Sequence, residues 1–159
     1  MEKITSFTID HIKLQPGLYV SRKDKVGAET VTTFDLRITS PNEEPVMNTA
    51  EIHTMEHLAA TYLRNNPEWK DSIVYWGPMG CLTGNYLLMR GRLEPADILT
   101  LMQDTFRFVA EFEGEIPGAA PMDCGNWVLH DLPMARLEAR RYLEEVLLNC
   151  KPENLVYPE

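Results

Sequence analysis

The sequence predicts an α+β fold in which a mostly antiparallel sheet is covered on one face by about three helices. The expected elements follow the order strands, helix, strands, helix, strand, helix, without the regular alternation of a doubly wound sheet. Apolar residues recur at every second position in the expected strands and at helical spacing in the expected helices. Pro and Gly clusters bound the segments, so we expect residues 1–159 to form a single domain.

The first half of the chain contains three expected strands and one helix. Residues 5–14 alternate between apolar and polar, residues 18–20 are a short apolar run, and residues 30–38 show the clearest period of two. Asn48 with Glu51 three positions later is the pattern of a helix N-terminus that carries an acidic capping residue. We therefore expect a helix from this cap to about residue 65.

The second half should add three strands and two helices. Proline at a first helical position is typical of a helix start, which Pro95 and Pro133 satisfy, and Pro152 prevents continuation of the last helix. The expected strands span residues 72–76, 85–90 and 126–129, and the expected helices span residues 95–112 and 133–149.

Composition excludes several classes of protein. A hydrophobic fraction of 44% with 25% charged residues is ordinary for a globular chain and argues against disorder. A formal charge of −9 argues against nucleic acid or an anionic membrane surface as partner. No apolar run is long enough for a membrane span and the start lacks an apolar signal region, so we expect a cytoplasmic protein with reduced cysteines.

The stretch from His53 to His57, with Glu56 between them, has the pattern H-x-x-E-H. On a helix, these three side chains project over one arc of about 100° at the rim of the core, so both imidazoles can reach one ion. The pattern is also that of the inverted zincin peptidases. The alternative is a pair of surface histidines beside a solvated glutamate, but two of only four histidines lie here, which favours metal binding.

A third ligand must come from elsewhere in the chain. Cys124 is the best candidate, because Gly125 removes side-chain bulk beside it, although a lone cysteine is more often a small buried hydrophobe. His130 competes as a ligand, while its neighbour Asp131 resembles a helix cap. A set of two histidines and one cysteine leaves a fourth position for water or substrate, as in a catalytic site.

The other two cysteines have different settings. Cys81 lies between Gly80 and Gly84 on an expected tight turn, which can present a sulfur beside backbone N–H groups and favour the thiolate; an inert turn cysteine is the alternative. Cys150 follows the last expected helix and is interpreted as structural or idle.

Together these segments resemble the S-ribosylhomocysteine lyase (LuxS) family over nearly the whole chain. The motifs that carry the resemblance are, in order, residues 6–11 (SFTIDH), 34–37 (FDLR) with 41–42 (PN), 52–58 (IHTMEHL), 78–81 (PMGC) with 83–84 (TG), 124–126 (CGN) and 130–132 (HDL). Three positions depart from the more familiar pattern: Tyr75, where many members have Asp, and Leu82 and Asp123. Tyr75 puts in doubt any substrate contact made by that family Asp.

The resemblance implies an α+β homodimer with two active sites at the subunit interface. It implies cleavage of S-ribosylhomocysteine to homocysteine and 4,5-dihydroxy-2,3-pentanedione, the precursor of autoinducer-2. It also implies one divalent metal per subunit, natively Fe2+, with Zn2+ or Co2+ as substitutes. The implied metal ligands are His53, His57 and Cys124.

The remaining implied residues suit this chemistry. Two shifts of a sugar carbonyl need groups that transfer protons, and the resemblance implies that Cys81 and Glu56 are these groups. Arg37 would bind substrate oxygen or favour the Cys81 thiolate, although a surface ion pair with Asp35 across the strand face is the alternative. Substrate would contact Ser6, Phe7 and His11, contributed by the partner subunit; for Phe7 the alternative is a core position.

Two other functions fit parts of the sequence. A small zinc metallopeptidase of the inverted-zincin type would use Glu56 to activate water, but it would leave Cys81 without a role. A metal-dependent binding protein without catalysis is the second alternative, with Cys81 inert.

Overall fold

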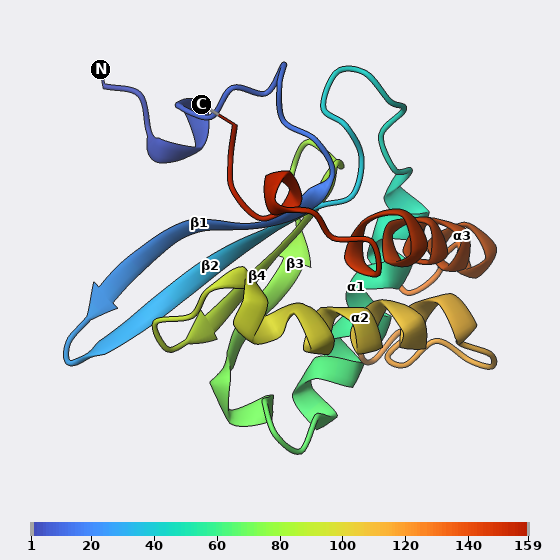
Figure 1. Cartoon of the computed structure of the whole chain (residues 1–159). Helices are drawn as coiled ribbons and strands as arrows, with labels where there is room; N and C mark the ends of the chain where they lie inside the picture. Colours follow the sequence, from blue (N-terminus) through green and yellow to red (C-terminus); the bar gives the residue numbers. More distant parts are fainter. Residues whose placement is uncertain (1, 159) are drawn as a thin grey trace.

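The computed structural model describes residues 2–158, which form an antiparallel sheet and three α-helices. The sheet has the strand order β1-β2-β4-β3. Its strands are β1 (Gly17–Val26), β2 (Glu29–Arg37), β3 (Ile73–Pro78) and β4 (Gly84–Arg90). The helices are α1 (Thr49–Asn65), α2 (Pro95–Glu111) and α3 (Leu132–Tyr142), and they gather on one side of the sheet (Figure 1). The predicted α+β class is confirmed.

The two faces of the sheet bury different side chains. Phe34 and Leu36 of β2 are fully buried in the hydrophobic core that the helices cover. Asp35 and Arg37, which alternate with them, are equally buried on the opposite face, where the C-terminal segment places Tyr157 against Asp35. Because polar groups are buried at a cost unless they are hydrogen-bonded, the contacts among Asp35, Arg37 and Tyr157 offset the cost of burying these groups.

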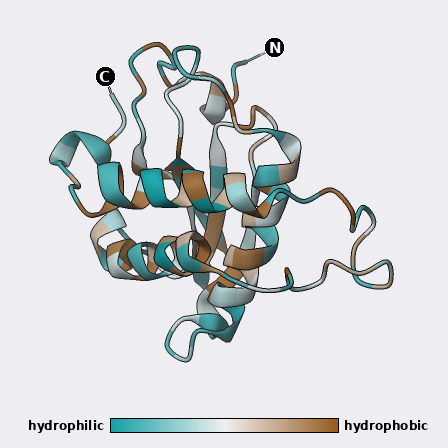
Figure 2. Cartoon of the chain, turned by 90° about the vertical axis from the view of Figure 1, so that its right-hand side faces the viewer, coloured by the Kyte–Doolittle hydropathy of each residue, from teal (hydrophilic) through white to brown (hydrophobic). Residues whose placement is uncertain are grey.

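Helix α1 begins and ends close to where the sequence predicts. Asn48 accepts a hydrogen bond from the Glu51 backbone N–H at 2.8 Å, and the Glu51 carboxylate accepts one from the Asn48 backbone N–H at 2.6 Å. This reciprocal capping box satisfies two backbone donors that the first turn leaves free. The hydropathy colouring of Figure 2 shows polar and apolar bands alternating along the helices, as expected where one face packs on a core.

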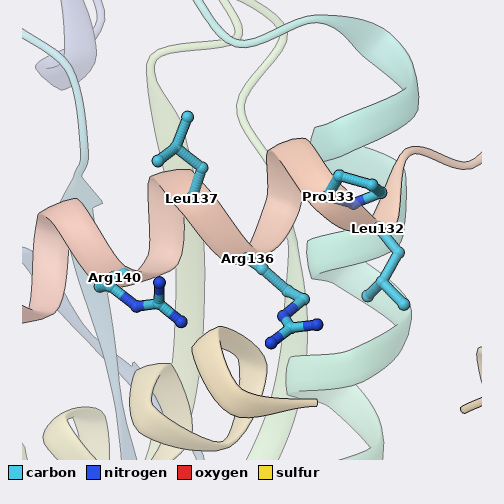
Figure 3. A pocket seen from close by; sticks show the side chains of 5 residues that line it. All are labelled: Leu132, Pro133, Arg136, Leu137 and Arg140. Carbon is cyan, nitrogen blue, oxygen red and sulfur yellow. The ribbon is translucent and has the colours of Figure 1, made fainter. Parts of the chain in front are cut away.

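Helix α3 also begins as predicted, because Asp131 caps it by accepting from the Met134 backbone N–H at 3.1 Å. The α-helix ends at Tyr142 and passes into one π-helical turn, Leu143–Leu147, so the predicted helix over 133–149 is shorter and less regular than expected. Arg136 and Arg140 extend from α3 toward the neighbouring helix (Figure 3), and both donate to the Ala110 carbonyl near the end of α2 at 3.2 Å. Positively charged side chains interact favourably with the carbonyl groups at a helix C-terminus. These hydrogen bonds therefore stabilise the packing of α3 against α2.

Two predicted strands are wrong. Residues 5–14 contain a 3₁₀ turn, Thr5–Phe7, followed by turns, because the Asp10 carboxylate accepts from the backbone N–H groups of Ile12 and Lys13. Such local bonds compete with strand pairing. Residues 126–129 form turns with a hydrogen bond from the Leu129 N–H to the Asn126 carbonyl instead of a strand. Within the described residues, no helix is long and apolar enough to cross a membrane.

Candidate functional site

The H-x-x-E-H stretch lies in α1, which places His53 and His57 one helical turn apart. The Nδ1 atom of His53 lies 2.7 Å from the Leu129 carbonyl, and that of His57 lies 2.8 Å from the Pro117 carbonyl. A carbonyl oxygen only accepts, so each ring carries its proton on Nδ1. Each Nε2 therefore keeps a free lone pair, which is the usual arrangement of histidines that bind a metal.

Cys124 brings a third donor atom to these two nitrogens. Its Sγ lies 3.4 Å from Nε2 of His53, and one ligand atom from each of the three side chains lies within 4.8 Å of the others. Two ligand atoms on one tetrahedral ion are roughly 3.3–3.8 Å apart, so the spacing suits a shared ion. The Asn126 backbone N–H also points at the sulfur, at 3.4 Å. Two imidazoles and a thiolate suit Zn, Fe or Co, so the residues present fit the predicted metal.

His130 does not join this cluster, although the sequence left it as a competing ligand. Its ring stacks on His53, with centroids 4.4 Å apart and planes at 11°. The Thr54 hydroxyl donates to the Ala50 carbonyl, so it accepts from Nδ1 of His130 at 3.1 Å. Burial, and then the charges of His53 and His57, lower the pKa of His130. His130 thus packs as a neutral ring against His53.

Glu56 lies on α1 between the two histidines and is half-buried. Within residues 2–158, its carboxylate makes no hydrogen bond or ion pair with protein groups. A carboxylate that lies beside these potential metal ligands and makes no structural contact is available to exchange protons with a bound molecule.

Cys81 lies in the turn between β3 and β4, as predicted. The turn closes with a hydrogen bond from the Leu82 N–H to the Met79 carbonyl at 3.0 Å, and Leu82 adopts the left-handed region at φ 60°. The Cys81 sulfur is exposed, and it lies 3.0 Å from the Thr83 hydroxyl and 3.8 Å from Nη1 of Arg37. Backbone strain of this kind recurs at functional sites.

Arg37 forms an ion pair with Asp35, but the pair is buried rather than on the surface as the sequence suggested, and the guanidinium also lies beside Cys81. Its Nη2 lies 2.6 Å from Oδ2 of Asp35, and its Nη1 donates to the Thr83 hydroxyl at 2.7 Å while facing Cys81. Burial alone would lower the pKa of Arg37, but the adjacent Asp35 carboxylate outweighs it and raises that pKa. The guanidinium therefore holds a permanent positive charge beside the sulfur.

The predicted substrate-binding residues divide between two places. His11 lines a cleft of about 370 Å³ together with Arg37 and Cys81. Ser6 lines a separate cleft of about 290 Å³ beside Tyr75, and Phe7 is 67% exposed, so it is not a core residue.

The metal cluster and the Cys81 cleft are separate in the described chain. No hydrogen bond among residues 2–158 links Cys81 to His53, His57 or Cys124, and none of those three lines the cleft around Cys81. The three potential ligands and the Cys81 cleft are therefore two separate groups of residues, called below the metal half-site and the Cys81 half-site.

The sequence reasoning missed the groups that orient these side chains. The Pro117 and Leu129 carbonyls are backbone atoms and leave no signal in the sequence. Gly118 is also part of the support, because it adopts φ +72° and a Cβ there would lie 3.3 Å from Nδ1 of His57. In the sequence, the only indication of this support is that Gly118 directly follows Pro117.

Replacing Gly118 with alanine is expected to weaken metal binding about tenfold or more, since the added Cβ crowds the ring that the Pro117 carbonyl orients. Gly27→Ala is the matched control, because Gly27 has a similar φ of +63° with nothing within 4 Å of its Cβ. Both changes carry the left-handed strain of about 1–2 kcal/mol. Competition against a metal chelator measures the difference, and equal affinities in the two variants would remove Gly118 from the site.

Comparison with known proteins gives a consistent picture. A family profile described as S-ribosylhomocysteinase (LuxS) matches residues 4–153. A protein named S-ribosylhomocysteine lyase from Phocaeicola vulgatus is 67% identical over 158 residues, covering 99% of this chain and 98% of that protein. Proteins of the same name from Porphyromonas gingivalis (64% identical, 100% of both chains) and Clostridium beijerinckii (55% identical, 99% of both chains) are also similar.

Proposed function

This chain belongs to the S-ribosylhomocysteinase (LuxS) family, and on that premise we propose that it cleaves S-ribosylhomocysteine to homocysteine and 4,5-dihydroxy-2,3-pentanedione. The family match and the names of the similar proteins identify the chain as a carbon–sulfur lyase. The observation that carries the proposal is the convergence of His53, His57 and Cys124, with both histidine Nε2 atoms left free by carbonyl contacts.

The proposed reaction needs proton transfer and no change of oxidation state overall. Moving the sugar carbonyl from the first to the third carbon takes two enolisations, and each removes a proton from one carbon and returns a proton to its neighbour. A β-elimination then removes one more carbon-bound proton and expels homocysteine as its thiolate. We assign these transfers to Cys81 and Glu56, one from each half-site.

His53, His57 and Cys124 would hold the divalent metal. When bound there, the metal supplies Lewis-acid polarisation of the sugar oxygens. The donor set is compatible with Fe2+, Zn2+ and Co2+, and we propose Fe2+ as the native ion. Activity that decays in air but persists after Co2+ substitution would support iron, whereas air-stable activity of the protein as isolated would contradict it.

We further propose that two copies of the chain complete each site across a homodimer interface. The separation of Cys81 from the metal cluster supports this arrangement. Apolar side chains are exposed near both half-sites, with Met122 at 96% and Val128 at 69% on the loop that carries Cys124. On the N-terminal segment that carries His11, Phe7 and Ile12 are 67% and 79% exposed. Exposed apolar side chains of this kind are typically buried when a stable protein–protein interface forms.

In this arrangement two of the proposed substrate contacts come from the Cys81 half-site. Arg37 and His11 line the cleft beside Cys81 and present hydrogen-bond donors to sugar oxygens. Ser6 and Phe7, on the N-terminal segment, would approach the metal half-site of the partner copy. These four residues are the proposed substrate-binding set.

The competing function is a peptidase that uses Glu56 to activate water. One assay separates the two: protein purified without air is supplied with S-ribosylhomocysteine, and a disulfide reagent detects free thiol. The lyase proposal predicts one thiol released for each substrate consumed. Peptide cleavage without thiol release would overturn it.

A further inference from the structure

We propose that Tyr157, in the C-terminal segment, is a positioning residue for Cys81 that acts through Asp35 and Arg37. The inference rests on the proposed role of Cys81 in the lyase reaction. It assigns a function to a part of the chain that neither the metal cluster nor the substrate cleft uses.

A continuous series of contacts joins the two residues. The Tyr157 hydroxyl donates to Oδ2 of Asp35 at 2.8 Å. Asp35 accepts from Arg37 twice, from Nη2 at 2.6 Å and from Nε at 3.2 Å. The remaining terminal nitrogen of Arg37, Nη1, reaches the Thr83 hydroxyl at 2.7 Å and the Cys81 sulfur at 3.8 Å. Each link is a direct contact between side chains.

Burial makes this series sensitive to the loss of one member. The side chains of Arg37 and Asp35 are 2% and 1% exposed, so water does not replace a missing partner. Asp35 shares its negative charge between two donors, Tyr157 and Arg37. In surroundings of low polarity, hydrogen bonds to a charged group are stronger and influence one another.

Tyr157 is held as a neutral donor. Its ring stacks on that of Tyr19, with centroids 4.8 Å apart and planes at 22°. Burial, followed by the charge of Asp35, raises the pKa of the Tyr157 phenol above its ordinary value, so the hydroxyl keeps its proton at neutral pH. The stack fixes the position of the ring, and the hydroxyl can satisfy Asp35 only from there.

The direction of the effect follows from these contacts. Without the Tyr157 hydroxyl, Arg37 is the side-chain donor left to Asp35 among the described hydrogen bonds, so the ion pair draws the guanidinium toward that carboxylate. The Nη1 atom of Arg37 then lies less favourably for the Cys81 sulfur, and we expect that sulfur to react more slowly. The other titratable groups around Cys81 are His11 and Glu44 of the cleft and Tyr86 nearby, and none of them contacts Tyr157 in the described hydrogen bonds.

Tyr157→Phe tests the proposal, because it removes the hydroxyl and keeps the stacked ring. Tyr19→Phe is the matched control: it alters the other ring of the same stack, whose hydroxyl bonds to the backbone carbonyls of Gln15 and Glu153. In the metal-loaded protein at fixed pH, iodoacetamide labels cysteines, and mass spectrometry follows the peptide that carries Cys81. The peptide that carries Cys150 reports on general unfolding.

We expect Tyr157→Phe to slow labelling of Cys81 about three- to tenfold, the range that the loss of one hydrogen bond covers. Labelling of Cys150 should not change, and kcat for thiol release should fall by a similar factor with little change in KM. Tyr19→Phe should label Cys81 at the wild-type rate. Wild-type labelling of Cys81 in Tyr157→Phe, or equal slowing in both variants, would overturn the inference. Slower labelling with unchanged kcat would support the positioning and contradict the catalytic role of Cys81.

Discussion

Cys81→Ala is expected to reduce thiol release from S-ribosylhomocysteine by about 10²–10⁴-fold, the range that a positioned acid–base group contributes. The sulfur is exposed in the cleft and faces Arg37 and the Thr83 hydroxyl, so it can both take and return a proton. Metal content should stay near wild type, because Cys81 does not belong to the donor cluster. Steady-state kinetics and elemental analysis measure the two quantities.

Cys150→Ala is the control for this variant, because Cys150 lies outside both half-sites and should tolerate the change with full activity. Glu56→Gln should reproduce the loss seen with Cys81→Ala, since it removes the second proposed proton carrier and preserves shape. Substantial residual turnover in Cys81→Ala or in Glu56→Gln would refute the role assigned to that residue.

The second large effect is expected from His53→Ala, which should lose its metal on dialysis and its activity with it. The change removes one of three donor atoms, and it also leaves the Leu129 carbonyl without its imidazole partner. Cys124→Ala should behave in the same way, because its sulfur is the third donor. Elemental analysis after dialysis gives the metal content per chain.

His11→Ala is the control for metal content, because it removes a histidine that lines the Cys81 cleft and lies outside the donor cluster. It should keep a full complement of metal while binding substrate more weakly. Stoichiometric metal in dialysed His53→Ala would remove that residue from the ligand set, and the same result for Cys124→Ala would remove the cysteine.

Most of the fold follows from local rules that the sequence displays. Asn48 with Glu51 marks the start of α1, and Pro95 marks the start of α2, because capping chemistry acts between residues a few positions apart. The alternation along β2 likewise predicts which side chains reach the helices. Where such rules conflict with local side-chain bonds, as at Asp10, the predicted strand does not form.

The donor cluster was partly predictable for the same reason. His53 and His57 share a helix, so their spacing reveals them, whereas Cys124 is brought to them only by tertiary folding. The carbonyls that orient the imidazoles, and the contact between Tyr157 and Asp35, join segments far apart in the chain. Sequence periodicity carries no information on such pairs, so only the structure reveals them.

In the proposed dimer, two half-sites that lie apart in one chain form one lyase site between two copies. Cys81→Ala and His53→Ala protomers can be co-expressed with different tags, and the mixed dimer can be isolated through both tags. Across a shared interface, one of its two sites combines the intact Cys81 of one copy with the intact metal cluster of the other. We predict thiol release at about half the wild-type rate per dimer. Activity no higher than that of either single variant would contradict the claim.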